Sequence, residues 1–99
     1  MVTEITDIKS ISDGNVLIDF YANSCGPCKA LNPILEEISQ EFENLKVTKI
    51  DVTTNPEASQ RFGVMGLPTV IFMKDCQVIH TLRGLSTKET ITSMLRKNM

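Results

Sequence analysis

The chain has 99 residues, of which 41% are hydrophobic and 22% charged, and its 10 Lys and Arg against 12 Asp and Glu give a net charge of −2. These totals fit one globular domain over residues 1–99, and the balanced charge excludes the basic surface that nucleic-acid binding needs. The sequence has no run of about 18 apolar residues for a membrane span and no export signal in its first residues, MVTEITDIKS, so we expect a cytoplasmic protein without membrane attachment.

The first half of the chain predicts a strand followed by a helix. Residues 1–12 predict a short edge strand and a helical turn. After the turn signal Asp13-Gly14, residues Asn15–Ala22 are rich in β-formers and apolar on both alternating faces, which is typical of a buried central strand. An amphipathic helix then extends to about Phe42, and we expect Pro33 to kink it near its first turns. Its apolar face consists of Leu31, Ile34, Leu35, Ile38 and Phe42.

The second half predicts a strand, a short helix and a hairpin. Leu45–Val52 reads as another buried strand. Asn55, as N-cap, and Pro56, as first residue, begin a short helix that ends near Phe62-Gly63. Two further strands, Pro68–Lys74 and Gln77–Arg83, are joined by a tight turn at Asp75-Cys76.

A last helix completes the predicted fold. Ser86 and Glu89 have the spacing of a capping box, and the apolar face that follows consists of Ile91, Met94 and Leu95. The order of elements predicts an α/β fold with a central mixed β-sheet flanked by helices on both faces.

Cys25 and Cys28 are separated only by Gly26 and Pro27, directly ahead of the first long helix. A thiol at a helix N-terminus faces free backbone N–H groups and the positive end of the helix dipole, which lower its pKa from about 8.5. Cys28, in the first turn, is close enough to attack a mixed disulfide on Cys25 and release a partner. Gly26 allows a tight turn, and Pro27 suits the start of a helix. The pattern predicts a centre for thiol–disulfide exchange.

Zinc binding is the alternative for these cysteines. Together with Cys76 and His80 they resemble a four-ligand zinc set. Residues 76 and 80, however, span a turn and a strand that separates them by roughly 13 Å, whereas zinc ligands lie within a few ångströms of one another. We therefore favour redox chemistry, with no metal.

The chain resembles the thioredoxin family along its whole length. The matching segments are IDFYANSCGPCKALNPILEEIS, KIDV, GVMGLPTVIFMKD and RGLSTKE. The resemblance implies the thioredoxin fold and a small protein disulfide reductase that cycles Cys25 and Cys28 between dithiol and disulfide, without a cofactor. It also implies disulfide-containing protein substrates and an electron donor of the thioredoxin-reductase type. We expect a monomer.

The resemblance implies roles for further residues. Asp19 lies on a buried strand, where an unpaired carboxylate is costly and its pKa should rise; in the family the matching aspartate moves protons to and from the resolving thiol, here Cys28. Lys49 matches a lysine near that aspartate. The alternatives are that Asp19 pairs with Lys49 or bonds at a strand edge, and that Lys49 is an ordinary surface residue.

The segment Gly66-Leu67-Pro68 matches the family's substrate groove. Pro68 matches a cis-proline that faces the dithiol, and the backbone of Leu67 would bind an extended peptide. Gly66 and Gly84 would permit close approach of a backbone, the alternative being ordinary turn glycines.

The sequence departs from the family pattern at three positions. Ser24 precedes the first cysteine, where the family commonly has tryptophan, and Tyr21 replaces a second tryptophan. Cys76 stands in the hairpin turn where glycine is usual, either as an idle thiol or as a regulatory one. These departures leave two alternatives open: a binding or assembly module with the same fold, and an oxidase, isomerase or glutaredoxin-like variant.

Overall fold

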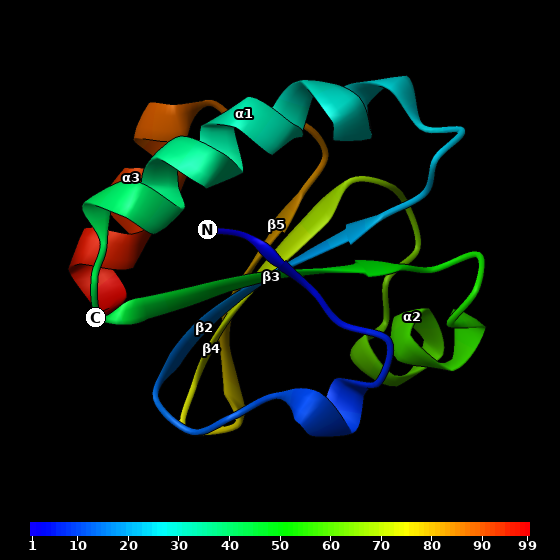
Figure 1. Cartoon of the computed structure of the whole chain (residues 1–99), viewed down its shortest axis with the longest axis horizontal. Helices are drawn as coiled ribbons and strands as arrows, with labels where there is room; N and C mark the ends of the chain where they lie inside the picture. The colour runs from blue at the N-terminus through cyan, green and yellow to red at the C-terminus, as the bar shows by residue number, and fades with distance from the viewer.

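The computed structural model describes residues 1–99 and contains a sheet of five strands in the order β1-β3-β2-β4-β5 (Figure 1). Strands β1, β3 and β2 run parallel, whereas β4 is antiparallel to β2 and β5 is antiparallel to β4. The predicted mixed sheet is confirmed. The strands are β1 (Thr3–Glu4), β2 (Asn15–Tyr21), β3 (Leu45–Asp51), β4 (Thr69–Lys74) and β5 (Gln77–Arg83).

Helices cover both faces of this sheet, as predicted (Figure 1). Helices α1 (Gly26–Glu41) and α3 (Lys88–Asn98) pack on one face, while the 3-10 helix η1 (Ile8–Ser10) and α2 (Pro56–Phe62) lie on the other. Because β2 is buried on both sides, its residues alternate between two cores: Leu17 packs toward α1 and α3, and Ile18 toward α2. No helix of the structure is both long and apolar enough to cross a membrane.

Helix α1 begins immediately after Cys25, which is its N-cap, and Phe42 ends it by donating its N–H to the carbonyl of Ile38 at 3.0 Å. These bounds match the prediction. The helix continues across Pro33 as one element, and the kink expected there stays a prediction. The buried residues are Cys28, Leu31, Leu35 and Ile38. Burial of this apolar face holds the helix, and with it Cys28, against the sheet.

Helix α2 starts and ends where the sequence predicts. Asn55 is the N-cap residue, Pro56 opens the helix, and Gly63 closes it in the left-handed conformation at φ 66°. The Asn55 side chain, however, makes no capping hydrogen bond; its Nδ2 donates to the carbonyl of Asp51 at 3.0 Å instead. Asn55 therefore ties the start of α2 to the end of β3.

The start of α3 differs from the prediction by one residue. Thr87, not Ser86, is the N-cap, and its hydroxyl oxygen accepts the N–H of Thr90 at 3.1 Å. The sequence pattern does not distinguish two adjacent hydroxyl residues as caps. In the fold, Lys88, the next residue, forms ion pairs with Glu37 and Glu41 of α1. The predicted apolar face of Ile91, Met94 and Leu95 is buried.

The β4–β5 hairpin turns at Asp75 and Cys76, both with positive φ (50° and 67°). The carboxylate of Asp75 accepts the N–H of Gly14 at 2.9 Å, and its own N–H donates to the Gly14 carbonyl at 2.9 Å. The hairpin turn therefore lies beside the start of β2.

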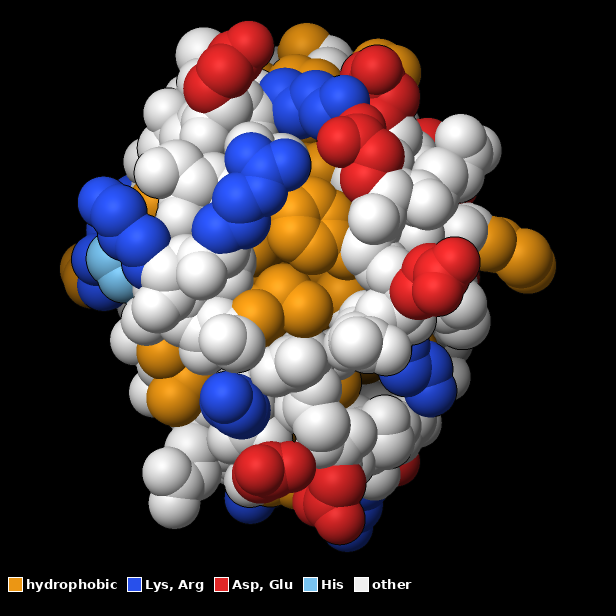
Figure 2. Space-filling view, turned by 90° about the vertical axis from the view of Figure 1, so that its left-hand side faces the viewer, with side chains coloured by type: hydrophobic (Ala, Val, Ile, Leu, Met, Phe, Trp, Pro, Cys, Tyr) orange, Lys and Arg blue, Asp and Glu red, His pale blue; other side chains and the backbone are white.

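The end of the molecule that carries α3 and the C-terminal end of α1 is seen in Figure 2. Apolar side chains are exposed there between Lys and Arg side chains on one side and Asp and Glu side chains on the other. The guanidinium of Arg96, on α3, lies 5.7 Å from the centre of the Phe42 ring. Since Cys25 lies at the other end of α1, this face is remote from the cysteine pair.

Candidate active site

Cys25 and Cys28 form a disulfide at the N-terminus of α1, with their Cα atoms 5.3 Å apart. The segment that follows β2 positions Cys25, whose N–H donates to the carbonyl of Ala22 at 3.1 Å. Cys25 is half-buried, whereas Cys28 is only 2% exposed. A partner protein can therefore reach the first sulfur but not the second.

The helix N-terminus acts on the sulfur of Cys25. The backbone N–H of Cys28 donates to Cys25 Sγ at 3.2 Å, so the sulfur takes the place of a capping oxygen. A negative charge on this atom gains from the same N–H and from the helix dipole. Gly26 and Pro27, which separate the two cysteines, are both exposed.

The Leu67-Pro68 peptide bond is cis, as the family resemblance implies. Thr69, which follows, pairs with Phe20 near the end of β2, so Pro68 lies at the same edge of the sheet as the segment leading to Cys25. Pro68 is buried, and neither the N–H nor the C=O of Leu67 forms a hydrogen bond within the chain. A free backbone donor and acceptor are what an added peptide strand requires.

The two glycines near Pro68 differ from each other. Gly84 has φ 83° and donates its N–H to the carbonyl of Pro68 at 2.8 Å, so the turn itself needs a glycine. Gly66 has no such φ, and a Cβ on either residue would meet no atom within 4 Å. Within the chain, therefore, no neighbouring atom requires a glycine for lack of space at either position. The expectation that the backbone of a bound partner approaches these glycines closely stays a prediction.

Asp19 is fully buried on β2, and neither of its carboxylate oxygens has a hydrogen-bond partner. Its side chain lies on the α1 side of the sheet, the side of its neighbour Leu17, two residues away. Burial raises the pKa of Asp19, the positive charge of Lys49 lowers it and the negative charge of Glu4 raises it further. Together these effects bring the pKa from 3.8 to about 7. The predicted rise in pKa is confirmed. A carboxyl with this pKa can both hold and release a proton near neutral pH.

Lys49 pairs in register with Asp19 across β2 and β3, but its ion pair is with Glu4 of β1, at 4.0 Å. No ion pair joins Lys49 to Asp19 within that distance, so the alternative in which the two residues pair directly is wrong. The Nζ atom of Lys49 also lies 5.4 Å from the centre of the Tyr21 ring. These contacts leave Lys49 half-buried, and its role at the site stays a prediction.

Glu4 is a neighbour of the site that the sequence did not indicate. Its two carboxylate oxygens accept the hydroxyl of Tyr21, each at 2.7 Å. The strand that carries Glu4 has only two residues, too few for an alternating pattern to show. Only the pairing of β1 with β3 brings Glu4 to the site.

A cavity of about 380 Å³ borders Cys28 and Lys49. The residues around it are Tyr21, Ala22, Asn23, Cys28, Lys29, Asn32 and Lys49.

Cys76 lies far from the disulfide. Its turn is beside the start of β2, whereas Cys25 follows the end of that strand, which is seven residues or roughly 20 Å away. The Cys76 thiol is exposed and donates to the Asp13 carboxylate at 3.4 Å, a contact that raises the pKa of Cys76. His80 is exposed on β5, and no group of three or more His, Cys, Asp or Glu side chains is arranged to hold a metal. The structure thus places Cys76 far from the Cys25–Cys28 disulfide, which argues against one zinc site built from these residues.

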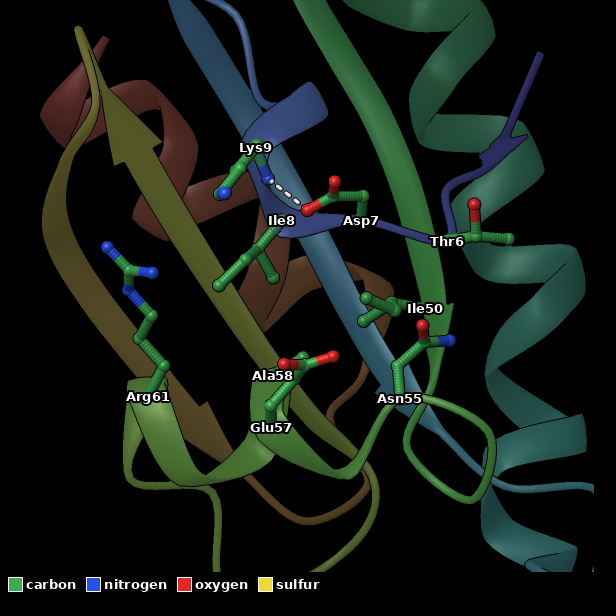
Figure 3. A pocket seen from close by; sticks show the side chains of 9 residues that line it. All are labelled: Thr6, Asp7, Ile8, Lys9, Ile50, Asn55, Glu57, Ala58 and Arg61. Carbon is green, nitrogen blue, oxygen red and sulfur yellow. Dashed lines mark hydrogen bonds between the residues drawn. The ribbon is translucent and has the colours of Figure 1, made fainter.

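A second cavity, of about 360 Å³, lies on the other face of the sheet between η1 and α2 (Figure 3). Charged side chains of η1 and α2, among them Lys9 and Arg61, border it, and Asp7 accepts the N–H of Lys9 at 2.9 Å. Neither cysteine of the disulfide borders this cavity, so it is separate from the exchange site.

The thioredoxin family model matches residues 4–97 of this chain. The chain belongs to the thioredoxin family. It is 46% identical over 101 residues to a thioredoxin of Listeria monocytogenes, covering 98% of both chains. It is also 44% identical over 89 residues to a thioredoxin of Bacillus subtilis, covering 89% of this chain and 86% of that one.

Solved structures of thioredoxins have the same fold. A mutant thioredoxin from Halobacterium salinarum superimposes with a TM-score of 0.91 at 27% identity, covering 97% of this chain and 88% of that one. The oxidised mitochondrial thioredoxin 3 of Saccharomyces cerevisiae gives a TM-score of 0.88 at 27% identity, with coverage of 97% and 94%. Family and disulfide together identify the chain as a thiol–disulfide oxidoreductase that reduces protein disulfides through Cys25 and Cys28.

Proposed function

We propose that Cys25 is the attacking thiol of this reductase and Cys28 the resolving thiol. The Cys25 thiolate attacks one sulfur of a substrate disulfide, forms a mixed disulfide and releases the first substrate thiolate. Cys28, once deprotonated, attacks Cys25 Sγ, which reforms the internal disulfide and releases the second thiolate. Two electrons pass to the substrate, and neither a metal nor an organic cofactor is needed. The observation that carries this assignment is the hydrogen bond from the Cys28 N–H to the half-buried Cys25 sulfur.

Asp19 is the group we assign to the proton of Cys28. The buried carboxyl lies on the α1 side of the sheet and has a pKa near the pH at which the thiol must lose its proton. Lys49 supports the ionised form of Asp19, since its positive charge lowers the pKa of that carboxyl. The cavity beside Cys28 and Lys49 lets water take part in the transfer.

The substrate-binding surface that we propose surrounds the exposed side of the disulfide. The free N–H and C=O of Leu67 would pair with an extended segment of the substrate, next to Pro68. The remaining residues leave space for that backbone: Gly26 and Pro27 on α1, Gly66 two residues before Pro68, and Gly84, which is hydrogen-bonded to the Pro68 carbonyl.

The cellular setting belongs to the proposal as well. We assign to the protein a single domain over residues 1–99, a monomeric state and a cytoplasmic location. Its electrons would come from a reductase of the thioredoxin-reductase type. The thioredoxins of Listeria monocytogenes and Bacillus subtilis, both similar over most of this chain, support this setting.

Reduction of insulin disulfides by dithiothreitol is the direct test. The wild-type chain and Cys76→Ser should accelerate the reaction equally, whereas Cys25→Ser should abolish it. Cys28→Ser should capture substrate proteins as mixed disulfides that dithiothreitol releases. Activity that survives Cys25→Ser would refute the assignment. A pull-down that survives replacement of both cysteines would favour a binding module instead.

The reduction potential of the Cys25–Cys28 pair tests the direction of electron flow. Redox buffers with mass-tag alkylation are suited to a chain without tryptophan. The accepted reference value for thioredoxin itself is about −270 mV, and a midpoint below about −230 mV supports a reductase. A midpoint between about −120 and −180 mV would instead indicate an oxidase or isomerase.

A further inference from the structure

Glu4, Lys49 and Asp19 stand in one row across three adjacent strands. Glu4 of β1 is paired in register with Lys49 of β3, which is paired in register with Asp19 of β2. Residues paired in register point to the same face of a sheet, and neighbouring strands are about 4.8 Å apart. Lys49 therefore stands between two carboxylates, one at the sheet edge and one in the core.

The contacts of Lys49 favour the carboxylate at the edge. Its Nζ lies 4.0 Å from Glu4 Oε1, whereas the oxygens of Asp19 have no hydrogen-bond partner. Tyr21 holds this arrangement, because its hydroxyl donates to Glu4 at 2.7 Å and its ring lies 5.4 Å from Lys49 Nζ. Burial and the hydrogen bond to Glu4 raise the pKa of Tyr21, so the hydroxyl stays a donor.

We propose that Glu4 is a positioning residue for the proton transfer at Asp19: it draws Lys49 toward the sheet edge and adds a negative charge of its own, so that Asp19 keeps its proton more firmly. The proposal rests on the proposed role of Asp19 in the exchange reaction. Glu4 touches neither sulfur, and its effect passes through Lys49 and through the field at Asp19.

Few other charged groups face Asp19. Cys28, from α1, forms the disulfide in this structure and becomes a thiol after reduction. Lys29, also from α1, borders the cavity shared by Cys28 and Lys49. On β4 the residue opposite Asp19 is the apolar Val70. Asp51 of β3 is close enough to act on Tyr21. Glu4 and Lys49 are therefore the charged residues whose substitution should most change the pKa of Asp19.

The titration of Asp19, followed by carbon-detected NMR of its carboxyl in the oxidised protein, is the first test. Glu4→Gln keeps an oxygen for the Tyr21 hydroxyl but removes the charge, and the Asp19 pKa should fall by roughly half to one unit. That range corresponds to one charge about 10 Å away at an effective dielectric constant of about 20–40. The matched control is Glu43→Gln. Glu43 is exposed and precedes the first residue of β3, at the opposite end of that strand from Lys49, so its substitution should leave the titration of Asp19 unchanged.

A cycle of variants separates the two parts of the effect. Lys49→Met should raise the pKa of Asp19, the opposite direction to Glu4→Gln. If Glu4 acts through Lys49, the shift caused by Glu4→Gln should be clearly smaller in the Lys49→Met background. An equal shift in both backgrounds would refute positioning of Lys49, and no shift in either would refute any role of Glu4.

The pH profile of insulin reduction links the titration to the reaction. In Glu4→Gln the acidic limb should move to lower pH by the same amount as the Asp19 pKa, with Glu43→Gln unchanged. If Glu4→Gln changes the pKa of Asp19 but not the pH dependence of insulin reduction, the catalytic relevance of Glu4 is refuted. A wild-type chain that does not reduce insulin would refute the proposed function alone, since the carboxyl titration needs no activity.

Discussion

The backbone N–H of Cys28 donates a hydrogen bond to the sulfur of Cys25 at 3.2 Å. In the mechanism that we propose, Cys28 therefore stabilises, through its backbone N–H, the negative charge on the attacking sulfur of Cys25. Its own sulfur is buried beneath the helix, away from external reagents. Cys25 and Cys28 are only three positions apart, but the first is the N-cap of the helix and the second is buried in its first turn. Their thiols therefore differ in reactivity.

This relationship predicts an order of thiol reactivity in the reduced protein. At pH 7 iodoacetamide should alkylate Cys25 roughly tenfold faster than Cys76, since the Asp13 contact raises the pKa of Cys76. Cys28 should react last because it is buried. Peptide mass spectrometry of timed samples measures all three rates. Faster alkylation of Cys76 than of Cys25 would contradict the assigned role of the helix N-terminus.

The buried carboxyl of Asp19 predicts a loss of stability with rising pH. Its pKa is raised from 3.8 to about 7 in the folded chain, so between these values the folded state binds the extra proton. The contribution of Asp19 to the free energy of unfolding is fully present below about pH 4. Between about pH 4 and pH 7 it decreases by about 1.4 kcal/mol per pH unit, and above about pH 7 it is lost, a total of up to about 4 kcal/mol. Asp19→Asn should remove this slope in urea unfolding of the oxidised protein.

The control for that experiment is Asp51, a carboxyl whose pKa is shifted in the opposite direction. Hydrogen bonds from Thr53 lower the pKa of Asp51, so its contribution is present at neutral pH and lost as the pH falls through the lowered value. Asp51→Asn should therefore be less stable than the wild type above about pH 4. Parallel stability curves for Asp19→Asn and the wild type would refute the assigned pKa.

The hairpin turn predicts a stabilising substitution. Both central residues, Asp75 and Cys76, have positive φ, a conformation that Asp-Gly adopts readily and that costs a non-glycine residue about 1 kcal/mol. Cys76→Gly should raise the free energy of unfolding by up to about that amount, less the small loss of the contact with Asp13. Cys76→Ser serves as the control, since it removes the thiol but keeps the strained backbone. Equal stability of the two variants would contradict the prediction.

The two glycines near Pro68, Gly66 and Gly84, should respond differently to replacement by alanine. Gly84→Ala forces an L-residue to φ 83° and should cost about 1–2 kcal/mol of unfolding free energy, although the added Cβ has room. Gly66→Ala should change stability by less than about 0.5 kcal/mol, because both the space and the φ are permissive. Chemical denaturation of both variants measures the difference.

The corrected start of α3 is testable by a pair of alanine substitutions. Thr87→Ala removes the hydroxyl that accepts the Thr90 N–H and should cost about 1 kcal/mol. Ser86→Ala, one residue earlier, removes a side chain that makes no capping bond and should be nearly neutral. The reverse order would restore Ser86 as the cap.

The sequence by itself determined the elements and the chemistry of the site. Strands buried on both faces, helices with one apolar face, and turn residues such as Gly63 leave local patterns that can be read without a structure. The cysteine pair before a helix likewise predicted exchange chemistry, because the effect of a helix N-terminus on a thiol is local. Ambiguity remained where neighbouring residues offer the same chemistry, as at Ser86 and Thr87.

The tertiary structure alone decided the environment of Asp19. The sequence showed that the residue is buried, but not that Lys49, its partner in register, turns toward Glu4. That choice depends on the pairing of a two-residue edge strand with β3, which brings together residues that are far apart in the chain. Long-range pairing of this kind leaves no periodic signal in a single sequence, and charge interactions act through space rather than along the chain.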